Sequence, residues 1–257
     1  ARKGAALMGV QGLEAMLRHH KAFYDDLRDP VALLRKPEET QLSQFWPYVF
    51  GGSVDEGDAA IYSDLMAQSQ RVVAEDTLRA GSLKGVQHLL DIGGGTGAFL
   101  EAAGQANRLM QMTLFDLPPV VPDAQARFDA AGMADRLTIA PGSFREEALP
   151  GGADAISLIR VLYDHADDTV RDLLAKVHDA LPPGGRLVVS EPMGGGARPD
   201  RAGDVYFAFY TMAMQTGRAR SAAEIVALLA DAGFSDIHSR APARSYVTRV
   251  VTARRPE

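Results

Sequence analysis

The segment Leu89–Gly97 constrains the fold of this chain more than any other feature. It reads Leu-Leu-Asp-Ile-Gly-Gly-Gly-Thr-Gly, and residues 98–107 after it have a helical pattern. The apolar run is typical of a buried strand that ends in an acid, Asp91, and then in a tight turn. Glycine lets a ligand approach the backbone, and the N-terminus of a helix presents unpaired N–H groups. We therefore predict a ligand-binding turn that includes Gly93, Gly95 and Gly97.

The acid before the turn indicates which ligands it suits. A carboxylate at Asp91 repels phosphate, whereas it attracts a ligand with an amino group and hydroxyls, such as S-adenosylmethionine. However, Gly93, Gly95 and Ala98 also fit the dinucleotide pattern G-x-G-x-x-G/A, with Asp116 roughly 20 residues further on. The turn alone therefore leaves a methyl donor, a nicotinamide dinucleotide and a purely structural role open.

Composition narrows the class of protein. The chain has 257 residues, of which 46% are hydrophobic, enough for a sizeable core in one large or two small domains. Its net charge of −6 argues against a nucleic-acid partner. The absence of cysteine excludes disulfides and thiolate metal sites and fits a reducing cytoplasm. No apolar run approaches the roughly 18 residues that a membrane helix needs.

Two patterns divide the chain near residue 80. Residues 5–80 have helical spacing, including an amphipathic helix over 61–78, whereas strands and helices alternate from residue 86 onward. We predict strands at 86–92, 111–116, 136–140, 154–162, 185–191, 234–239 and 245–253. We predict helices at 98–107, 119–131, 167–180, 204–215 and 222–232. This alternation predicts βαβ crossovers and a mostly parallel sheet covered on both faces.

The last two predicted strands break the parallel pattern. Only a few residues separate them, and a parallel crossover needs a dozen or more, so they must be antiparallel. A seven-stranded sheet with one antiparallel strand near its end is the architecture of class I Rossmann-like methyltransferases and differs from the dinucleotide fold. We therefore predict an α/β methyltransferase domain over 81–257, preceded by a helical segment over 1–80 that contributes substrate-pocket helices. This topology favours the methyl donor.

Ligands of such sheets bind at the carboxyl ends of the strands. Asp116 ends the second strand and can accept two hydrogen bonds from a ribose diol, although it also suits a turn or an N-cap before Pro118. Ser143 and Phe144 follow the third strand, where they could contact an adenine; ordinary core packing explains Phe144 equally well. The predicted cofactor-binding residues are Asp91, Gly93, Gly95, Gly97, Asp116, Leu117, Ser143, Phe144 and Arg160.

The segment Arg160–His165 ends the fourth strand, where a reacting group would lie beside the methyl sulfonium. It lacks the Asn/Asp-Pro-Pro-aromatic motif of enzymes that methylate nitrogen in nucleic acids, which favours methylation of oxygen. Tyr163 and His165 are the candidate proton acceptors, and the pKa of histidine suits that role better. We predict no metal site, because the acids 164, 167 and 168 suit the start of a helix.

Aromatic and methionine side chains indicate the substrate pocket. They occupy nearly every face of the helix predicted over 204–215, and helix packing and a pocket wall explain them equally well. The aromatic segment Phe45–Phe50 could supply the opposite wall. The predicted substrate-binding residues are Trp46, Tyr48, Phe50, Tyr206, Phe209, Tyr210 and Met214.

Several strings resemble the S-adenosylmethionine-dependent O-methyltransferase family of plant phenolic, acetylserotonin and bacterial polyketide enzymes. They are Leu89–Gly97, Phe115–Pro118, Arg160–His165 and Leu181–Val189. More narrowly, Phe45–Gly51, Ala74–Ala80, Val161–His165, Ser190–Met193 and Ala197–Tyr210 resemble the carotenoid branch of this family in phototrophic bacteria. The resemblance implies S-adenosylmethionine as cofactor and the tertiary hydroxyl of an acyclic, demethylspheroidene-type 1-hydroxycarotenoid as methyl acceptor. It also implies a homodimeric full-length protein. The aromatic pocket and the lack of a long apolar run predict a cytoplasmic protein, peripheral on the inner membrane, that takes this substrate from the bilayer.

The chain departs from the plant enzymes in two respects. Where they read His-Asp-Trp with the catalytic base first, this chain reads Tyr163-Asp164-His165. Glu191 matches one of the two acids that orient the plant base, and the other acid falls at Ala219 and is missing. The dimerisation domain of the family is represented here only by its tail before residue 20, so we expect a longer natural protein. A phenol or polyketide O-methyltransferase, a nicotinamide oxidoreductase and a non-catalytic cofactor-binding dimer remain open.

Overall fold

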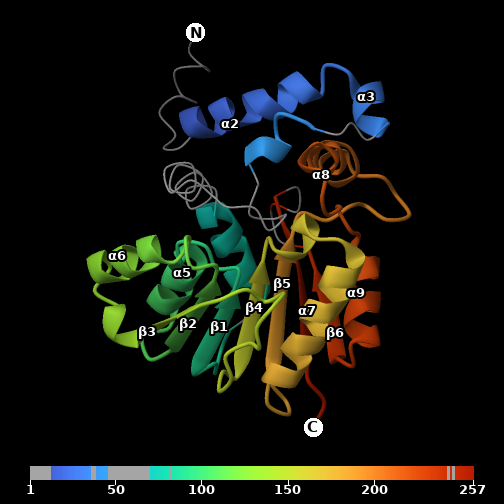
Figure 1. Cartoon of the computed structure of the whole chain (residues 1–257). Coiled ribbons are helices and arrows are strands. Elements are labelled where there is room, and N and C mark those ends of the chain that lie inside the picture. Colours follow the sequence, from blue (N-terminus) through green and yellow to red (C-terminus); the bar gives the residue numbers. More distant parts are fainter. Residues whose placement is uncertain (1–12, 36–38, 46–69, 82, 242–243, 245–246) are drawn as a thin grey trace.

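The computed structural model describes residues 13–35, 39–45, 70–81, 83–241, 244 and 247–257. A helical cap lies over one end of an α/β domain (Figure 1). The cap contains α2 (Leu13–Asp26), α3 (Pro30–Leu34) and α8 (Ala208–Met214), so both halves of the chain contribute to it. A helix over residues 70–80 leads from the cap side into the sheet. The predicted pocket residues Trp46, Tyr48 and Phe50 lie outside the described residues.

The sheet has seven strands in the order β3-β2-β1-β4-β5-β7-β6. All neighbours pair in parallel except β7, which is antiparallel to both β5 and β6. The strands are β1 (His88–Ile92), β2 (Gln111–Asp116), β3 (Leu137–Pro141), β4 (Ala155–Ile159), β5 (Arg186–Glu191), β6 (Ser235–Arg240) and β7 (Arg249–Arg254). The predicted class I topology with one antiparallel strand is confirmed.

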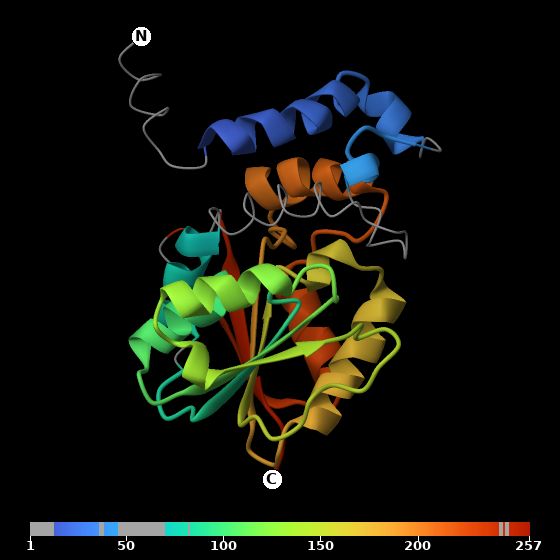
Figure 2. The same ribbon diagram turned by 60° about the vertical axis from the view of Figure 1, so that its left-hand side comes forward.

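Helices cover both faces of the sheet, which Figure 2 shows from the side. They are α5 (Ala98–Ala106), α6 (Pro122–Ala130), α7 (Asp167–Ala180) and α9 (Ala222–Asp231). Successive side chains of a strand point to opposite faces. Leu90 and Ile92 of β1 accordingly pack in the cluster beneath α7 and α9, whereas Leu89 packs in the cluster beneath α5 and α6. Each crossover helix is therefore held by its own apolar layer.

Two predicted elements end differently from the sequence-based prediction. The strand predicted over 154–162 stops at Ile159, because Arg160 adopts a left-handed φ of 61°. The Arg160 N–H donates to the Ser190 carbonyl oxygen at 2.8 Å, which fixes this exit from the strand. The helix predicted over 204–215 consists of a π-helix, η5 (Arg201–Phe207), followed by α8. Runs of π-helix are rare and are frequently found at functional sites.

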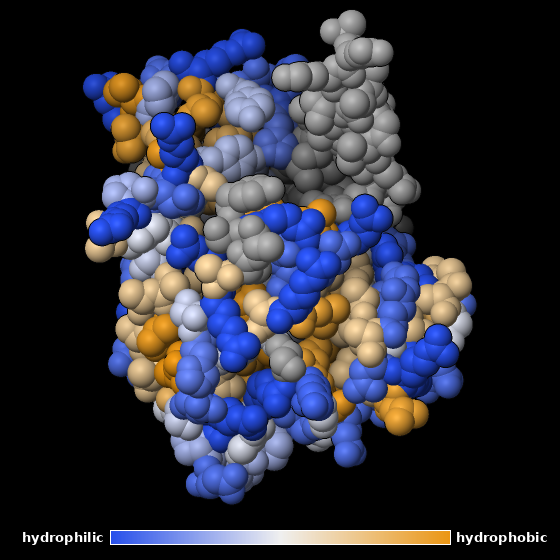
Figure 3. Space-filling view, turned by 180° about the vertical axis from the view of Figure 1, so that it is seen from behind, coloured by the Kyte–Doolittle hydropathy of each residue, from blue (hydrophilic) through white to orange (hydrophobic). Residues whose placement is uncertain are grey.

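The cap has its own small core. Phe23, Leu33 and Leu42 from the first part of the chain pack with Tyr210, Ala213 and Met214 of α8. Apolar side chains are also exposed on this cap: Val31 is 52% and Leu34 is 58% exposed. On the rear face in Figure 3, hydrophobic and hydrophilic side chains are interspersed over the sheet domain.

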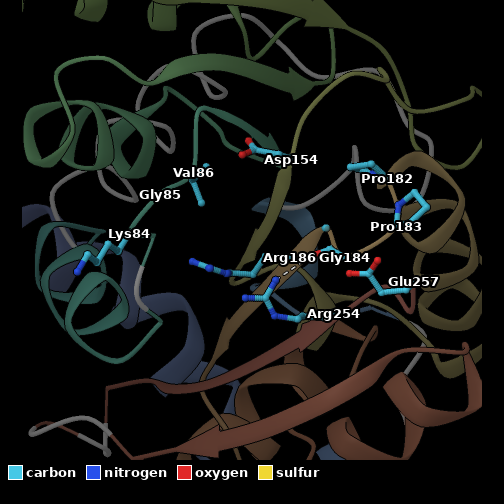
Figure 4. A pocket seen from close by; sticks show the side chains of 11 residues that line it. Lys84, Gly85, Val86, Asp154, Pro182, Pro183, Gly184, Arg186, Arg254 and Glu257 are labelled. Carbon is cyan, nitrogen blue, oxygen red and sulfur yellow. Dashed lines mark hydrogen bonds between the residues drawn. The ribbon is translucent and has the colours of Figure 1, made fainter.

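The opposite end of the sheet carries a cleft of about 300 Å³ (Figure 4). It lies at the amino ends of β1, β4 and β5, near the C-terminus, and its lining includes Lys84, Asp154, Arg186, Arg254 and Glu257. Arg254 donates to the Gly184 carbonyl oxygen at 2.8 Å. Burial and the charge of Arg254 lower the pKa of Arg186. None of the predicted site residues lines this cleft, because ligands of parallel sheets bind at the carboxyl ends.

A chain of buried hydroxyls joins three segments behind β5. Ser190 Oγ lies 2.6 Å from both Thr77 Oγ1 and Thr248 Oγ1. All three residues are at most 1% exposed. The helix over 70–80, β5 and the segment before β7 are therefore linked through one serine. Buried hydroxyls that lose a partner cost roughly 1–3 kcal/mol.

We expect Ser190→Ala to lower the free energy of unfolding by about 1–3 kcal/mol, because it leaves two buried threonine hydroxyls without this partner. Urea unfolding followed by circular dichroism measures the change. Ser235→Ala is the matched control, since Ser235 is exposed and donates only a long bond of 3.4 Å to Arg254 O. Equal effects of the two substitutions would contradict a role for the hydroxyl chain.

Candidate functional site

Two carboxylates lie at the carboxyl ends of neighbouring strands. Asp91 of β1 is 1% exposed, and its Oδ1 accepts a hydrogen bond of 2.6 Å from Ser157 Oγ. Its Oδ2 is buried and has no hydrogen-bond partner among the described residues. Burial, with a smaller contribution from the charge of Asp116, raises the pKa of Asp91 to about 7. An unpaired buried oxygen is costly, which marks this position as one where a donor or a cation is expected.

Asp116 ends β2 and holds the glycine turn. Its two oxygens accept hydrogen bonds of 2.7 Å from the backbone N–H groups of Gly95 and Leu117. Burial also raises the pKa of this carboxyl. Gly93, Gly95 and Gly97 have φ angles of 68°, 58° and 78°, and Gly97 precedes the first residue of α5. At Gly95 the space that a Cβ would occupy is open to 4 Å. The turn therefore leaves room for a ligand beside two acids.

The segment after β3 lies against the loop after β4. Phe144 packs edge-on against His165, with ring centroids 5.2 Å apart. Arg145 Nη2 lies 3.2 Å from His165 Nδ1. Because a guanidinium can only donate, Nδ1 is the acceptor in this contact. Ser143 Oγ accepts a bond of 3.3 Å from the Arg145 N–H. The structure thus brings Ser143, Phe144 and His165 together, as the prediction of one site requires, and adds Arg145.

Glu191 organises the loop that follows β4. It ends β5 and is 1% exposed. Its Oε1 accepts hydrogen bonds from the N–H groups of Val161 and Leu162 at 2.9 and 2.8 Å. Its Oε2 accepts one from the Tyr163 N–H at 3.4 Å. Burial raises the pKa of Glu191 to about 7, although these hydrogen bonds oppose the shift. Glu191 was predicted as a catalytic residue, and in the structure its carboxylate positions the backbone of the loop after β4.

The carbonyl groups of the same loop are held from the other side by residues 216–220. Arg220, 2% exposed, donates to the carbonyl oxygens of Leu162 and His165 at 2.7 and 2.9 Å. The backbone N–H of Arg218 donates to the carbonyl oxygen of Tyr163 at 2.9 Å, and Thr216 Oγ1 donates to the carbonyl oxygen of Asp164 at 2.9 Å. This is the segment in which Ala219 replaces the second acid of the plant enzymes. Residues 216–220 therefore lack the second acid of the plant enzymes and instead donate hydrogen bonds to the backbone carbonyl oxygens of the loop after β4.

An ion pair fixes Arg220 in turn. Its Nη2 lies 2.6 Å from Asp167 Oδ1 at the start of α7. Hydrogen bonds from Arg218 and Arg220 lower the pKa of Asp167 to about 2. The acids 164, 167 and 168, which follow one another closely in the sequence, therefore have separate surroundings. Within the described ranges, no three His, Asp or Glu side chains come together as metal ligands would.

Tyr163 occupies the position of the plant base and is 4% exposed. Burial and the neighbouring Asp164 raise the pKa of its hydroxyl well above the usual range, while a hydrogen bond with Arg160 opposes this. The Tyr163 side chain also hydrogen-bonds Asp164. Its ring packs edge-on against Phe207 of η5, with centroids 6.2 Å apart. The predicted cofactor residue Arg160 therefore lies in a polar cluster with Tyr163 and Asp164.

The predicted pocket residues of η5 and α8 face the cap. Tyr206 hydrogen-bonds His20 of α2, and its ring stacks on Tyr210 with centroids 6.2 Å apart. Tyr210 and Met214 are buried in the cap core, and Phe209 is partly buried against it. Burial raises the pKa of both tyrosine hydroxyls. These side chains pack within the cap, and Tyr206 and Tyr210 also carry hydroxyls near Arg160.

Comparison with known proteins identifies the family. Residues 24–235 match the model of an O-methyltransferase domain. The chain is 56% identical over 256 residues to demethylspheroidene O-methyltransferase of Cereibacter sphaeroides, covering 99% of this chain and 68% of that protein. It is 54% identical to the protein of the same name from Rhodobacter capsulatus, covering 99% of this chain and 64% of that protein. This chain belongs to the O-methyltransferase family.

A solved structure supports the fold. Human N-acetylserotonin methyltransferase, determined in complex with S-adenosylmethionine, superposes with a TM-score of 0.79 at 23% identity. The superposition covers 96% of this chain and 70% of the human chain. The predicted family and fold class are confirmed. The chain spans about two thirds of the length of the relatives named here. In the described part of the chain, no helix is both long and apolar enough to cross a membrane.

The residues at the carboxyl edge fit a cationic methyl donor. S-adenosylmethionine carries a sulfonium and an amino group, and this edge gathers Asp91 and Asp116 beside an open glycine turn. The unpaired Oδ2 of Asp91 can accept from an amino group or a hydroxyl. A pyrophosphate would meet two carboxylates here, which repel it. The individual cofactor contacts stay predictions.

We expect the affinity for S-adenosylmethionine to fall as the pH decreases below about 7. The pKa of Asp91 is raised to about 7 in the free protein, so protonation there removes the charge that attracts the cationic ligand. The positive charge of bound S-adenosylmethionine lowers the pKa of Asp91. The affinity for this ligand therefore increases as the pH rises and levels off above about 7, where Asp91 is already ionised in the free protein. Isothermal titration calorimetry between pH 5.5 and 8 measures it.

The control for this titration is Asp91→Asn, in which the affinity is lower and this component of the pH dependence disappears. Titration of the ligand's own amino group is common to both proteins and cancels in the comparison. Asp172→Asn, at an exposed position of α7, leaves the profile unchanged. An unaltered pH profile in Asp91→Asn would show that another group binds the ligand cation.

We expect Arg220→Met to reduce the free energy of unfolding by about 3–5 kcal/mol, because it removes a buried charge from its partner and two carbonyls from their donor. Arg218→Met is the matched control: its side chain is 45% exposed and bonds the same Asp167, and we expect less than about 1 kcal/mol. Thermal and urea unfolding measure both. A small effect at Arg220 would mean that the loop is held without it.

Proposed function

We propose that this chain transfers the methyl group of S-adenosylmethionine to the tertiary hydroxyl of an acyclic 1-hydroxycarotenoid. The observation that carries the proposal is the 56% identity to a demethylspheroidene O-methyltransferase over 99% of the chain. At such identity over nearly all residues, a shared reaction and substrate class is the simplest interpretation. The family membership supports methyl transfer to oxygen as the reaction type.

The acidic edge performs the first task, which is to bind and orient the methyl donor. Asp91 and Asp116 attract its cationic part, while the glycine turn admits it close to the backbone. When bound, S-adenosylmethionine supplies an electrophilic methyl group on a sulfonium, which is already a good leaving group. The protein therefore contributes mainly by placing the acceptor oxygen in line with that methyl group.

The loop after β4 performs the second task. Its N–H groups are held by Glu191 and its carbonyls by residues 216–220, so its side chains are presented on a fixed backbone. A tertiary alcohol is scarcely acidic, so its proton must leave as the new bond forms rather than before. Tyr163 and His165 stay the proton acceptors predicted from sequence.

The cap performs the third task, which is to shelter an apolar substrate. Phe207 of η5 packs edge-on against Tyr163, and Tyr206 packs edge-on against Phe207. Exclusion of water around the reacting groups strengthens the electrostatic interactions that the site uses. A long hydrocarbon with one terminal hydroxyl suits an apolar cap above a polar cluster. Tyr206, Phe209, Tyr210 and Met214 are therefore retained as proposed substrate residues.

We expect label from methyl-labelled S-adenosylmethionine to appear in 1-hydroxy acyclic carotenoids when the full-length protein is supplied. Carotenoids are presented in detergent or vesicles, and simple phenols are tested in parallel. Asp91→Asn is the matched negative control, because it impairs donor binding. Label in phenols alone would overturn the carotenoid substrate and leave the O-methyltransferase activity. No label in either, with the donor bound, would favour a non-catalytic cofactor-binding protein.

The proposed assembly and location need separate measurements. A homodimer and a cytoplasmic protein peripheral to the inner membrane stay predictions from sequence. Light scattering of the full-length chain gives its mass in solution. Co-sedimentation with vesicles of bacterial lipid composition tests peripheral association, with vesicles containing the carotenoid as the comparison.

A further inference from the structure

Three consecutive side chains, Tyr163, Asp164 and His165, are the groups from which a proton acceptor must come if the loop after β4 presents the substrate hydroxyl. They lie in or directly after the 3-10 turn η4 (Leu162–Asp164). The backbone of this turn is held by Glu191 and Arg220. An acceptor needs a lone pair that no protein donor already occupies. The contacts of the three side chains separate them on this criterion.

Tyr163 is a donor in its surroundings. Its side chain hydrogen-bonds Asp164 and Arg160. Arg160 can only donate, so the phenolic oxygen accepts from Arg160 and the phenolic hydrogen is directed to Asp164. Burial raises the pKa of this hydroxyl, so it stays neutral. A neutral phenol that is engaged in both directions is a poor acceptor for an alcohol proton.

His165 is engaged in a different way. Its Nδ1 accepts from Arg145, so the neutral ring carries its hydrogen on Nε2. Burial, Arg145 and Arg220 lower the pKa of His165 to about 4. A proton added to this ring would face the guanidinium of Arg145. The imidazole therefore has its lone pair occupied and is a weak base at neutral pH.

Asp164 is the exception among the three. Its Oδ1 is buried and has no hydrogen-bond partner among the described residues, whereas its carboxyl accepts the Tyr163 bond. Burial and the charge of Glu191 raise its pKa well above the usual range, and Arg160 opposes the shift. A carboxylate whose pKa is raised is a better proton acceptor. The charged or titratable groups that act on it are Arg160, Tyr163, Glu191 and Tyr210.

We propose that Oδ1 of Asp164 accepts the proton of the substrate hydroxyl during methyl transfer. The inference rests on the proposed function. In this step the hydroxyl oxygen forms a bond to the methyl carbon, and the carbon–sulfur bond breaks with its electron pair left on sulfur. The O–H hydrogen moves as a proton to Asp164 Oδ1, which becomes a neutral carboxylic acid. Tyr163 acts as a positioning residue, because its hydroxyl bonds the Asp164 carboxyl, and Arg160 in turn bonds the Tyr163 hydroxyl.

The kinetic test compares Asp164→Asn with the full-length wild-type protein under saturating donor. We expect the turnover rate on the 1-hydroxycarotenoid to fall by about 100-fold or more, with donor affinity unchanged within twofold. Asp164→Glu restores part of the rate because the acceptor returns. Asp168→Asn, with a side chain 98% exposed on the next helix, leaves the rate unchanged. The wild-type rate rises with pH through one ionisation that is absent in Asp164→Asn.

A second readout does not depend on turnover. A carboxyl whose pKa is raised in the folded state loses stability as the pH rises from its unfolded pKa, roughly 3.9, through its folded pKa. Replacing it by the neutral amide therefore raises the melting temperature at pH 8, by about 2–4 °C, and raises it less at pH 5. A carboxylate with a purely structural role would instead give a lower melting temperature in the asparagine variant at both pH values.

The outcomes distinguish this inference from the proposed function. Equal rates for wild type and Asp164→Asn on the carotenoid would overturn the inference and leave the proposed function. A destabilised Asp164→Asn at pH 8 would also overturn it, because the oxygen would then have a structural partner. No transfer to the carotenoid by the wild-type protein would overturn both. A large rate loss in His165→Gln, with Asp164→Asn near wild type, would assign the proton to the imidazole instead.

Discussion

The carboxylate of Glu191 holds the loop on which the rest of the site depends. Three consecutive N–H groups, those of Val161, Leu162 and Tyr163, would otherwise be buried without a partner. The chain reaches this position by a left-handed turn at Arg160 that no regular strand could continue. Because Glu191 ends β5, its hydrogen bonds fix the position of the loop relative to the sheet. The side chains of the loop are therefore placed by an interior strand of the sheet, which pairs with β4 and β7.

Crowding of acids gives the same edge its electrostatic character. The pKa values of Asp91, Asp116, Asp164 and Glu191 are all raised by burial. Two of these carboxyls keep a buried oxygen without a partner in the described structure. Such an arrangement costs stability in the free protein and favours a ligand that brings positive charge and donors. A sulfonium with an amino group and a ribose meets both requirements, whereas a dinucleotide brings additional negative charge. The electrostatics thus agree with the topology.

Much of this architecture could be predicted from sequence because it depends on local patterns. Alternating apolar runs indicated the strands, the short connection before β7 indicated the antiparallel strand, and acids after strands indicated Asp91 and Asp116. The end of β4 could not be predicted, because the φ of Arg160 is fixed by a bond to Ser190, which is distant in the sequence. The π-helix before α8 was likewise hidden, since its residues have ordinary helical spacing.

Arg145, Thr216 and Arg220 were missed for the same reason. Each acts on the loop after β4 from another part of the chain, through contacts that no local pattern encodes. Comparison with the plant pattern showed only that an acid is absent at Ala219. The structure shows what this segment does instead, which is to donate hydrogen bonds to the carbonyls of the loop. An absent residue in a pattern is thus weaker evidence against activity than the contacts of its neighbours.

The residues Tyr163-Asp164-His165 are consistent with the low acidity of the hydroxyl group that is proposed to receive the methyl group. A phenol has a pKa of roughly 10, so an imidazole with a pKa of roughly 6.5 can share or remove its proton before attack. A tertiary alcohol is far less acidic, and an early base gains nothing from it. Proton transfer must coincide with methyl transfer. This requires a proton acceptor that already lies beside the hydroxyl group, rather than a strong base that removes the proton before methyl transfer. In this chain the imidazole accepts from Arg145 and the phenol donates to Asp164, whereas Oδ1 of Asp164 has no hydrogen-bond partner among the described residues. The contacts of Tyr163, Asp164 and His165 therefore agree with the proposed alcohol substrate.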